Sequence, residues 1–516
     1  MNRKLYIDSV FLVALGMLTS LSLPPFNYFL INFFTFTFFF LFLLKKTNQL
    51  KNKRFFFLYG WLFGFGYFVT SLYWITISLT FDQNYKFLIP FAFILIPSFL
   101  ALFYGFVSFL FLIYRPRNII SSIILFSLIF GVLEFIRGTI LTGFPWNLIA
   151  YSFSNQLEFI SVITIIGTYG FNLLCISLFT SPAIFLLRNK DSKRYIWAYI
   201  LFLIIIILIY IYGSSYKEKF NNSVPKTYNY KLRVIGSNVG LDRFYSNIDS
   251  VSVIQELIKI SQPNLNDKTI FIWPEGIVPN VSQQKLIEYK SLFDENFNEN
   301  HLFIIGINSE PLNNESKDYF NSLSVYDNNL NLLDSYNKIN LVPFGEFLPF
   351  DNILRNIGFR SLTNNYQSFS SGDQRDIIEI NKQNISLRVL PLICYEIIYS
   401  GKLFYNSDFD FIVNISEDGW FGKSIGPKQH FTHSIFRAIE SGKYVVRSSN
   451  NGIAAIINPL GIIEQSVEFG KSGYIDLKSG KKIQPTIFSK YGNKIFGLVI
   501  LLYIFLIFSF NKIKNE

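Results

Sequence analysis

Long apolar runs near the two ends of this chain constrain its fold more than any other feature. A membrane's hydrocarbon core, about 30 Å thick, needs roughly 20 apolar residues in each helix that crosses it. Of the 516 residues, 50% are hydrophobic, and the mean hydropathy is +0.32. We therefore predict eight membrane-spanning helices, near residues 8–23, 27–44, 55–76, 87–113, 119–136, 157–187, 196–213 and 494–511. The run 157–187 is long for one span, so we expect it to be tilted or partly interfacial.

Basic residues mark one side of these predicted spans. Outside positions 214–492 there are 18 Lys and Arg residues, and 15 of them lie in segments that would share one face of the membrane. These segments are residues 3–4, 45–54, 114–118, 188–194 and 511–516. Short loops rich in Lys and Arg stay in the cytoplasm. We therefore expect an extracytoplasmic polar domain (214–492) between a membrane domain (1–213) and a C-terminal span with a cytoplasmic tail (493–516).

The distribution of charge argues against nucleic-acid binding. The net charge of the chain is +11, but residues 214–492 hold 28 basic and 29 acidic side chains. A nucleic-acid-binding domain needs a basic excess to neutralise phosphates. The polar domain has none, so nucleic acid is not expected as a partner.

The polar domain shows the pattern of alternating strands and helices. From Lys231 to Ser309, short β-rich runs alternate with amphipathic stretches, which predicts the order strand, helix, strand, helix, strand. Further elements predicted are strands at 321–327, 385–394 and 410–416, a helix at 429–444, and a strand pair within 447–461 around the turn "NNG". The pattern predicts an α/β or α+β domain.

Three predicted strand ends carry polar residues directly after apolar runs. Glu275 stands in "FIWPEG", Lys338 and Glu346 stand in "YNKINLVPFGEFLP", and Cys394 and Glu396 stand in "LICYEI". A cysteine acts as a nucleophile through its thiolate, which a nearby ammonium or general base promotes. A lysine can also stabilise an oxyanion, and a glutamate can carry a proton. Together these residues could form a nucleophilic site.

Each of these residues also has a structural interpretation. A cysteine between apolar neighbours is more often a small buried hydrophobe than a nucleophile, and a single Glu or Lys can be a solvated strand end. His430 and His433 share one helix face, but no third ligand at a recognisable spacing supports a zinc site. Cys175 lies in an apolar run, so a disulfide with Cys394 is not expected.

These motifs resemble those of the carbon–nitrogen hydrolase (nitrilase) superfamily, in particular the bacterial apolipoprotein N-acyltransferases. The resemblance rests on "WPEG", "YNKINLVPFGEFLP", "LICYEI" and the stretch 414–461, together with membrane-domain motifs at 60–75 and 131–147. It covers nearly the whole chain. The predicted order of seven spans, a polar domain and a last span is also similar to the architecture of that family.

The resemblance implies a fold and a role for each residue. Glu275 would be the general base, Lys338 the cation that stabilises a tetrahedral oxyanion, and Cys394 the nucleophile. Supporting positions near the site would be Glu346, Tyr395 and Glu396. The implied fold is a membrane α-helical bundle of about eight spans with the four-layer α-β-β-α sandwich of nitrilases standing on the outer leaflet.

The reaction implied by the resemblance is a two-step acyl transfer through a thioester on Cys394. The acyl donor would be a membrane phospholipid, and the acceptor would be the N-terminal amine of a diacylglyceryl-cysteine lipoprotein. No metal and no organic cofactor would be needed, and we expect a monomer surrounded by membrane lipids. The implied location is the bacterial inner membrane, with the catalytic domain on the periplasmic side.

The chain departs from the family pattern in three places. Glu417-Asp418 stands where the family often has Asn-Asp, and "VIGSN" lacks the glutamine of an early strand, with Gly236 inside it. The segment "DRFYSN" (242–247) replaces the Lys-Trp that commonly follows. These departures bear on the contacts with the substrates and leave the three core positions untouched.

Two other functions remain open at this stage. With water as the acceptor, the same three residues would make a membrane-anchored amidase or other hydrolase, although one span would be enough to anchor it. A transporter or sensor would bind a ligand without catalysis and would need charges inside the membrane. Glu134 and Arg137 are nearly the only such charges, and they could form an interfacial ion pair or contact a substrate.

Overall fold

The computed structural model describes residues 3–47, 53–187, 193–244, 249–278, 280–310, 318–356, 361, 368–382, 384–403 and 408–512. The chain divides into two compact units. The first contains residues Met1–Lys219, Tyr399–Phe404 and Thr486–Glu516, and the second contains Phe220–Ile398 and Tyr405–Pro485. The domain boundaries expected at residues 213 and 492 stay predictions.

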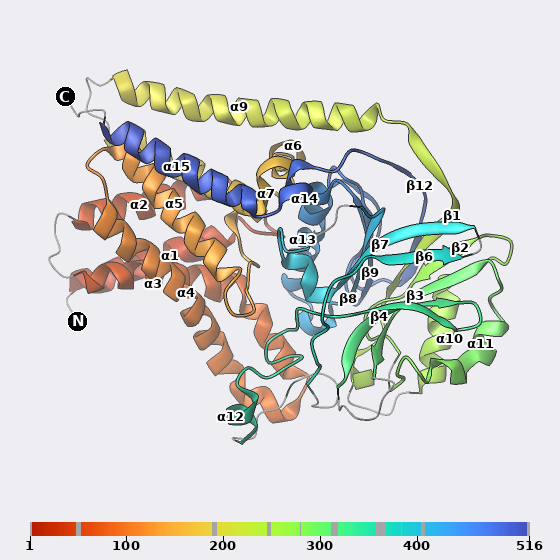
Figure 1. Cartoon of the computed structure of the whole chain (residues 1–516). Coiled ribbons are helices and arrows are strands. Elements are labelled where there is room, and N and C mark those ends of the chain that lie inside the picture. Colours follow the sequence, from red (N-terminus) through yellow and green to blue (C-terminus); the bar gives the residue numbers. More distant parts are fainter. Residues whose placement is uncertain are drawn as a thin grey trace. The chain divides into compact units, whose positions relative to one another are not determined.

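The first unit is a bundle of apolar helices (Figure 1). Its longer helices are α1 (Arg3–Ser20), α2 (Ile31–Thr47), α3 (Arg54–Ser71), α4 (Ile89–Tyr114), α5 (Ile119–Arg137), α7 (Ile163–Thr180), α9 (Lys193–Asn221) and α15 (Lys494–Lys512). Its short helices are η1 (Tyr73–Thr80), η2 (Gln83–Leu88), η3 (Ile149–Phe153), α6 (Leu157–Ile160), α8 (Ala183–Leu187) and α14 (Ile487–Tyr491). Large apolar side chains remain exposed on its surface, which suits a membrane environment better than water.

Several of these helices could cross a membrane. Within the described residues, five helical stretches are long and apolar enough, and α3 with η1, bent by 47°, would be a sixth if the two form one span. The five are Gln83–Tyr114, Ile119–Arg137, Ile163–Leu187, Tyr199–Asn221 and Lys494–Lys512. The count of eight spans stays a prediction. So does the sidedness, and 4 of the 15 basic residues on which it rests lie in residues 48–52, 188–192 and 513–516, outside the described ranges.

The predicted span 157–187 is not one straight helix. It is divided into α6, α7 and α8, and Gly167 inside α7 has a φ of +68°, a left-handed conformation that glycine adopts without strain. The long apolar run therefore crosses its part of the bundle in bent pieces.

The glycines in the motif at 60–75 lie where α3 packs closely against neighbouring helices. A Cβ added to Gly60 would lie 2.1 Å from the carbonyl oxygen of Tyr104 in α4, and one added to Gly66 would lie 2.2 Å from that of Val13 in α1. Small residues let helix backbones approach closely where no hydrophobic effect drives their association. The two glycines thus hold α3 against both neighbours.

The second unit is built on one hydrogen-bonded path of strands, in the order β5-β4-β3-β2-β1-β9-β8-β7-β6. The strands are β1 (Pro225–Ser237), β2 (Thr269–Ile272), β3 (His301–Ser309), β4 (Phe320–Asp327), β5 (Leu332–Asn337), β6 (Ile378–Lys382), β7 (Ile385–Ile393), β8 (Phe411–Glu417) and β9 (Tyr444–Asn450). Off this path, β10 (Ala454–Ile457) pairs with β9 and β11 (Ile463–Val467), and β12 (Gly473–Lys481) pairs with β1. Strands β1 and β9 share only two residue pairs, so the path divides there into two halves.

The alternation of side chains builds a layered sandwich from these halves. In β2, Ile270 and Ile272 belong to a core that includes strands of both halves, whereas Phe271 and the following Trp273 pack in a second core with the helices α10 (Ser250–Ser261) and α11 (Lys290–Asp294). On the other side, α13 (Gly426–Ser441) packs on β9, and Figure 1 shows α13 and the pair α10/α11 flanking the strands. This is the predicted α-β-β-α arrangement.

Candidate active site

The three core candidates lie at the ends of strands in the second unit. Glu275 follows β2 by three residues, Lys338 directly follows β5, and Cys394 directly follows β7 as the first residue of η7 (Cys394–Ile398). Strands β2 and β5 belong to one half of the sandwich and β7 to the other. All three side chains are buried, with exposed fractions of 6%, 1% and 8%. The fold therefore brings together residues that lie far apart in the sequence.

Lys338 lies between two carboxylates. Its Nζ donates to Oε1 of Glu346 at 2.8 Å and to Oε1 of Glu275 at 3.2 Å. Burial alone would lower the pKa of the ammonium, but the charges of Glu275 and Glu346 raise it well above its ordinary value. Lys338 is therefore a permanent cation in a site that excludes most water.

Backbone N–H groups and one side-chain amide donate further hydrogen bonds to both carboxylates. Asn321 donates from Nδ2 to Oε1 of Glu275 at 2.7 Å and to Oε1 of Glu346 at 3.0 Å. The N–H of Val342 donates to Oε2 of Glu346 at 2.8 Å, and the N–H of Glu417 donates to Oε2 of Glu275 at 2.9 Å. Each carboxylate is thereby held in one orientation.

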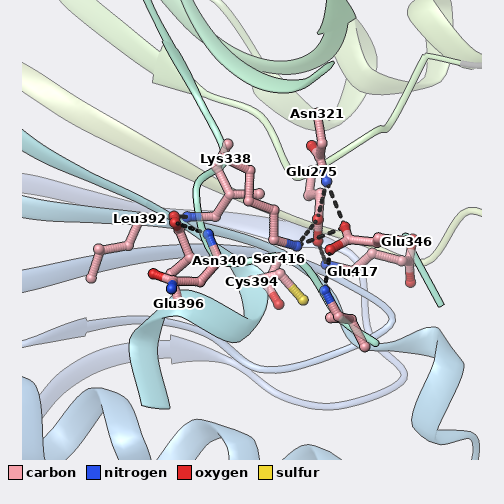
Figure 2. A network of polar contacts seen from close by, with 12 residues as sticks. Glu275, Asn321, Lys338, Asn340, Glu346, Leu392, Cys394, Glu396, Ser416 and Glu417 are labelled. Carbon is pink, nitrogen blue, oxygen red and sulfur yellow. Dashed lines mark hydrogen bonds and ion pairs between the residues drawn. The ribbon is translucent and has the colours of Figure 1, made fainter. Parts of the chain in front are cut away.

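Cys394 sits at a sharp turn between strand and helix. Its φ is +48°, a left-handed conformation that a residue other than glycine adopts only when the surroundings enforce it. Figure 2 shows its side chain beside the Lys338 ammonium and the Glu275 carboxylate. Burial and the negative charge of Glu275 raise the pKa of the thiol well above its ordinary value, although Lys338 opposes this. The resting group is therefore a neutral thiol that needs a base to become a nucleophile.

A buried polar cluster supports the turn at Cys394. The ring of His430 contacts the carbonyl oxygen of Cys394 through Nε2 at 3.2 Å and Oδ1 of Asp418 through Nδ1 at 2.9 Å. Arg447 donates to both oxygens of Asp418, at 3.0 and 2.8 Å. Although burial opposes it, Arg447 and His430 lower the pKa of the Asp418 carboxyl. An ionised Asp418 thus orients the imidazole that holds the nucleophile's backbone.

Glu396 is an anchor for the surrounding backbone and has no exposed surface. Its Oε1 accepts hydrogen bonds from the hydroxyl of Tyr336 at 2.7 Å and from the N–H groups of Ile339 and Asn340 at 3.1 and 3.2 Å. Oε1 also pairs with Arg375, and Oε2 accepts from the N–H of Ile393 at 2.9 Å. One carboxylate therefore connects the segment after Lys338 to the end of β7, directly before Cys394.

Replacing Glu396 by glutamine should destabilise the protein by about 3–5 kcal/mol, because it leaves the buried guanidinium of Arg375 without its counter-ion. Thermal unfolding of the purified protein would measure the loss. The matched control is Glu379→Gln, which removes the largely exposed partner of Arg388 and should change stability by less than about 1 kcal/mol. Equal shifts in the two variants would contradict the anchoring role.

The remaining predicted residues are placed as follows. Tyr395 is buried directly after Cys394, with 7% of its surface exposed.

In the first unit, Glu134 and Arg137 form a buried ion pair, and Arg137 also donates to the carbonyl oxygen of Phe144, as the ion-pair alternative expects. Among the residues that the structure describes, no three His, Cys, Asp or Glu side chains are arranged to hold a metal ion.

Sequence reasoning missed several polar residues of the site. Asn321 lies in a strand with no motif around it, and Arg447 lies within the motif stretch 414–461 but is given no role of its own by the sequence. His430 stands out in the sequence only for a zinc site that its spacing does not support, and its contact with the carbonyl oxygen of Cys394 is not predicted. No local signal identifies these residues, because their partners are distant in sequence.

Comparison with known proteins bears on both parts of the chain. Residues 15–180 match the family model "Apolipoprotein N-acyltransferase N-terminal domain", and residues 266–476 match the model "Carbon-nitrogen hydrolase". An amidase from Nesterenkonia sp. of known structure is similar with a TM-score of 0.32 and 11% identity, over 52% of this chain and 95% of that one.

Similarity to curated relatives extends over almost the whole chain. The apolipoprotein N-acyltransferase of Rickettsia prowazekii (strain Madrid E) is 31% identical over 99% of this chain and 100% of its own length. That of Rhodopseudomonas palustris is 30% identical over 97% of this chain and 94% of its own. With its carbon–nitrogen hydrolase domain, the chain therefore belongs to the apolipoprotein N-acyltransferase family.

Proposed function

We propose that this enzyme transfers a fatty acyl group from a membrane phospholipid to the N-terminal amine of diacylglyceryl-cysteine lipoproteins. The observation that carries the proposal is the convergence of a buried thiol, a carboxylate and an ammonium, Cys394, Glu275 and Lys338, in a chain of this family. The near full-length relationship favours this function over the non-catalytic transporter or sensor.

The first step forms the acyl-enzyme. Glu275 accepts the proton of the Cys394 thiol while the sulfur attacks the ester carbonyl carbon of the phospholipid. The carbonyl oxygen becomes an oxyanion, which the Lys338 ammonium stabilises in a site of low dielectric. When the intermediate collapses, the C–O bond breaks, the proton passes from Glu275 to the leaving oxygen, and lysophospholipid departs. A thioester remains on Cys394.

The second step reverses these roles. The α-amino group of the lipoprotein attacks the thioester carbonyl, and Lys338 again stabilises the oxyanion. Glu275 takes a proton from the attacking nitrogen and returns it to the sulfur as the C–S bond breaks. The products are an N-acylated lipoprotein and free thiol, in a ping-pong sequence. Neither step calls for a metal or an organic cofactor.

The apolar helices support a membrane location for this chemistry. Exposing an acyl chain to water costs about 0.8 kcal/mol for each CH₂ group, so a site that receives both lipids at the membrane avoids that cost. We assign the catalytic unit to the periplasmic side of the bacterial inner membrane, on the distribution of basic residues in the sequence, and a monomer to the active form.

Burial of the nucleophile favours transfer over hydrolysis. Only 8% of Cys394 is exposed, so a thioester formed there would be shielded from bulk water until the amine arrives. The amidase or hydrolase alternative requires water to reach the same carbonyl.

Mass spectrometry can test the proposal. After incubation with a phospholipid that carries one defined fatty acid, the peptide containing Cys394 should gain one acyl group. Adding a diacylated lipopeptide should then remove this adduct and yield N-acylated lipopeptide. Release of free fatty acid in its place would support the hydrolase, and absence of any adduct would contradict an acyl-enzyme mechanism.

A further inference from the structure

A second buried ion pair lies next to Glu275. Arg243 pairs with Glu417, and the two side chains have exposed fractions of 0% and 3%. The carboxylate of Glu417 also accepts hydrogen bonds from Nδ2 of Asn450 at 2.6 Å and from the N–H of Gly419 at 2.7 Å. The pair is thus fully satisfied inside the second unit and has no free oxygen for a substrate.

This pair reaches Glu275 from two directions. The backbone N–H of Glu417 donates to Oε2 of Glu275 at 2.9 Å. Arg243 donates from Nε to the carbonyl oxygen of Gly276 at 3.4 Å, and Gly276 follows Glu275 with a φ of +50°. The ion pair therefore links Glu417, whose N–H orients the Glu275 carboxylate, to Gly276, the residue that follows Glu275.

The two members of the pair come from the segments in which the sequence departs from the family pattern. Arg243 lies in "DRFYSN" and Glu417 in "ISEDGW", 174 residues apart. Losing either member alone would leave an uncompensated buried charge, which is strongly unfavourable, whereas the two together form a neutral pair. The structure thus brings two of the departing segments into direct contact.

We propose that Arg243 and Glu417 are positioning residues that hold Glu275 in the orientation from which it accepts the proton of Cys394. The proposal rests on the role of Glu275 as general base in the proposed function. Glu417 contacts Glu275 through its backbone N–H, and neither side chain of the pair takes part in the proton transfer. Their effect is geometric, because a displacement of about 1 Å in a catalytic group can lower a rate 100-fold.

The test measures Cys394 reactivity in two ways, with Arg243→Met, Glu417→Gln and the double variant in the full-length protein. One readout is the single-turnover rate of Cys394 acylation at saturating phospholipid, and the other is alkylation of Cys394 by iodoacetamide, which needs only a thiolate. Each variant should slow both reactions about 10- to 100-fold and leave the half-saturating phospholipid concentration unchanged. The double variant buries no lone charge, so it remains informative if a single variant fails to fold.

A Glu275→Gln background separates positioning from general destabilisation. Once the base is absent, adding Arg243→Met should not slow alkylation further, because the pair acts through Glu275. Arg243→Lys keeps a cation and should recover part of the rate. The control Arg233→Met breaks another largely buried ion pair, with Asp476, and should lower stability without changing alkylation.

Two outcomes would overturn the inference: equal slowing by Arg243→Met with and without Glu275, or full Cys394 reactivity in the double variant. Failure of the proposed function has a different signature. In that case the wild-type protein would form no acyl adduct with phospholipid, while its alkylation would still depend on Glu275, Arg243 and Glu417.

Discussion

Changing Cys394 to alanine should abolish the acyl adduct and lower acyl transfer about 10⁴-fold or more, the loss typical when the nucleophile is removed from residues that act as a unit. Lys338 cannot replace it as the nucleophile, because it is a cation held by two carboxylates. Alanine keeps the same Cβ at the same positive φ, so the backbone strain is unchanged. The loss should therefore come from chemistry and not from unfolding.

The matched control is the second free cysteine. Cys175 is buried in α7 of the helical unit, and Cys175→Ala should leave the adduct on Cys394 and the rate of acyl transfer unchanged. Intact-protein mass spectrometry and thermal unfolding of both variants would separate chemistry from stability. An adduct that persists in Cys394→Ala, or disappears in Cys175→Ala, would place the nucleophile elsewhere.

Much of the catalytic unit is predictable because its strands are apolar runs with polar ends. The run "HLFIIGINS" forms β3 over His301–Ser309, the same residues that the pattern indicates, and β7 and β8 lie within one residue of their predicted ranges. Polar residues at the predicted strand ends make Glu275, Lys338 and Cys394 candidates from the sequence alone. Parallel strands deliver their ends to a common edge, so this local signal carries three-dimensional information.

The pattern gives no residue range for strands in which that signal is weak. In β11, four of five residues are exposed, and β5 begins with exposed leucines, Leu332 and Leu333, where a buried alternation would be expected. These elements pair through backbone hydrogen bonds and depend on their neighbours for stability. The same holds for the polar network: Asn321 bridges Glu275 and Glu346 only because the sandwich brings three segments together.

The helical unit illustrates another limit of sequence reasoning. Hydropathy locates the apolar runs, and helices are found at each of them within the described residues. It does not indicate how a helix is divided, as at Gly167, nor why α3 needs glycine at positions 60 and 66, which depends on the approach of neighbouring backbones. Periodicity describes one helix, whereas these features belong to pairs of helices.

Replacing Lys338 by methionine should have two separable effects. The first is on stability, because Glu275 and Glu346 would face each other without the ammonium that both contact. Breaking a buried pair in this way costs about 3–5 kcal/mol. Burial already raises the pKa of the Glu346 carboxyl, and without Lys338 it should rise further. A carboxyl whose pKa is raised in the folded state destabilises the folded protein as pH increases. The loss of stability in Lys338→Met should therefore be smaller at acidic than at neutral pH.

The second effect is on catalysis, and a double variant isolates it. Lys338→Met should slow acylation of Cys394 by about 10²- to 10³-fold or more, because the oxyanion loses its cation. Lys338→Met combined with Glu346→Gln removes one charge of each sign, so it should recover most of the stability but none of the acylation rate. Unfolding curves and single-turnover acylation on the wild-type protein and the two variants would decide the matter. If the double variant regained both, Lys338 would be a structural counter-ion to Glu346, and the oxyanion would have to be stabilised by other donors.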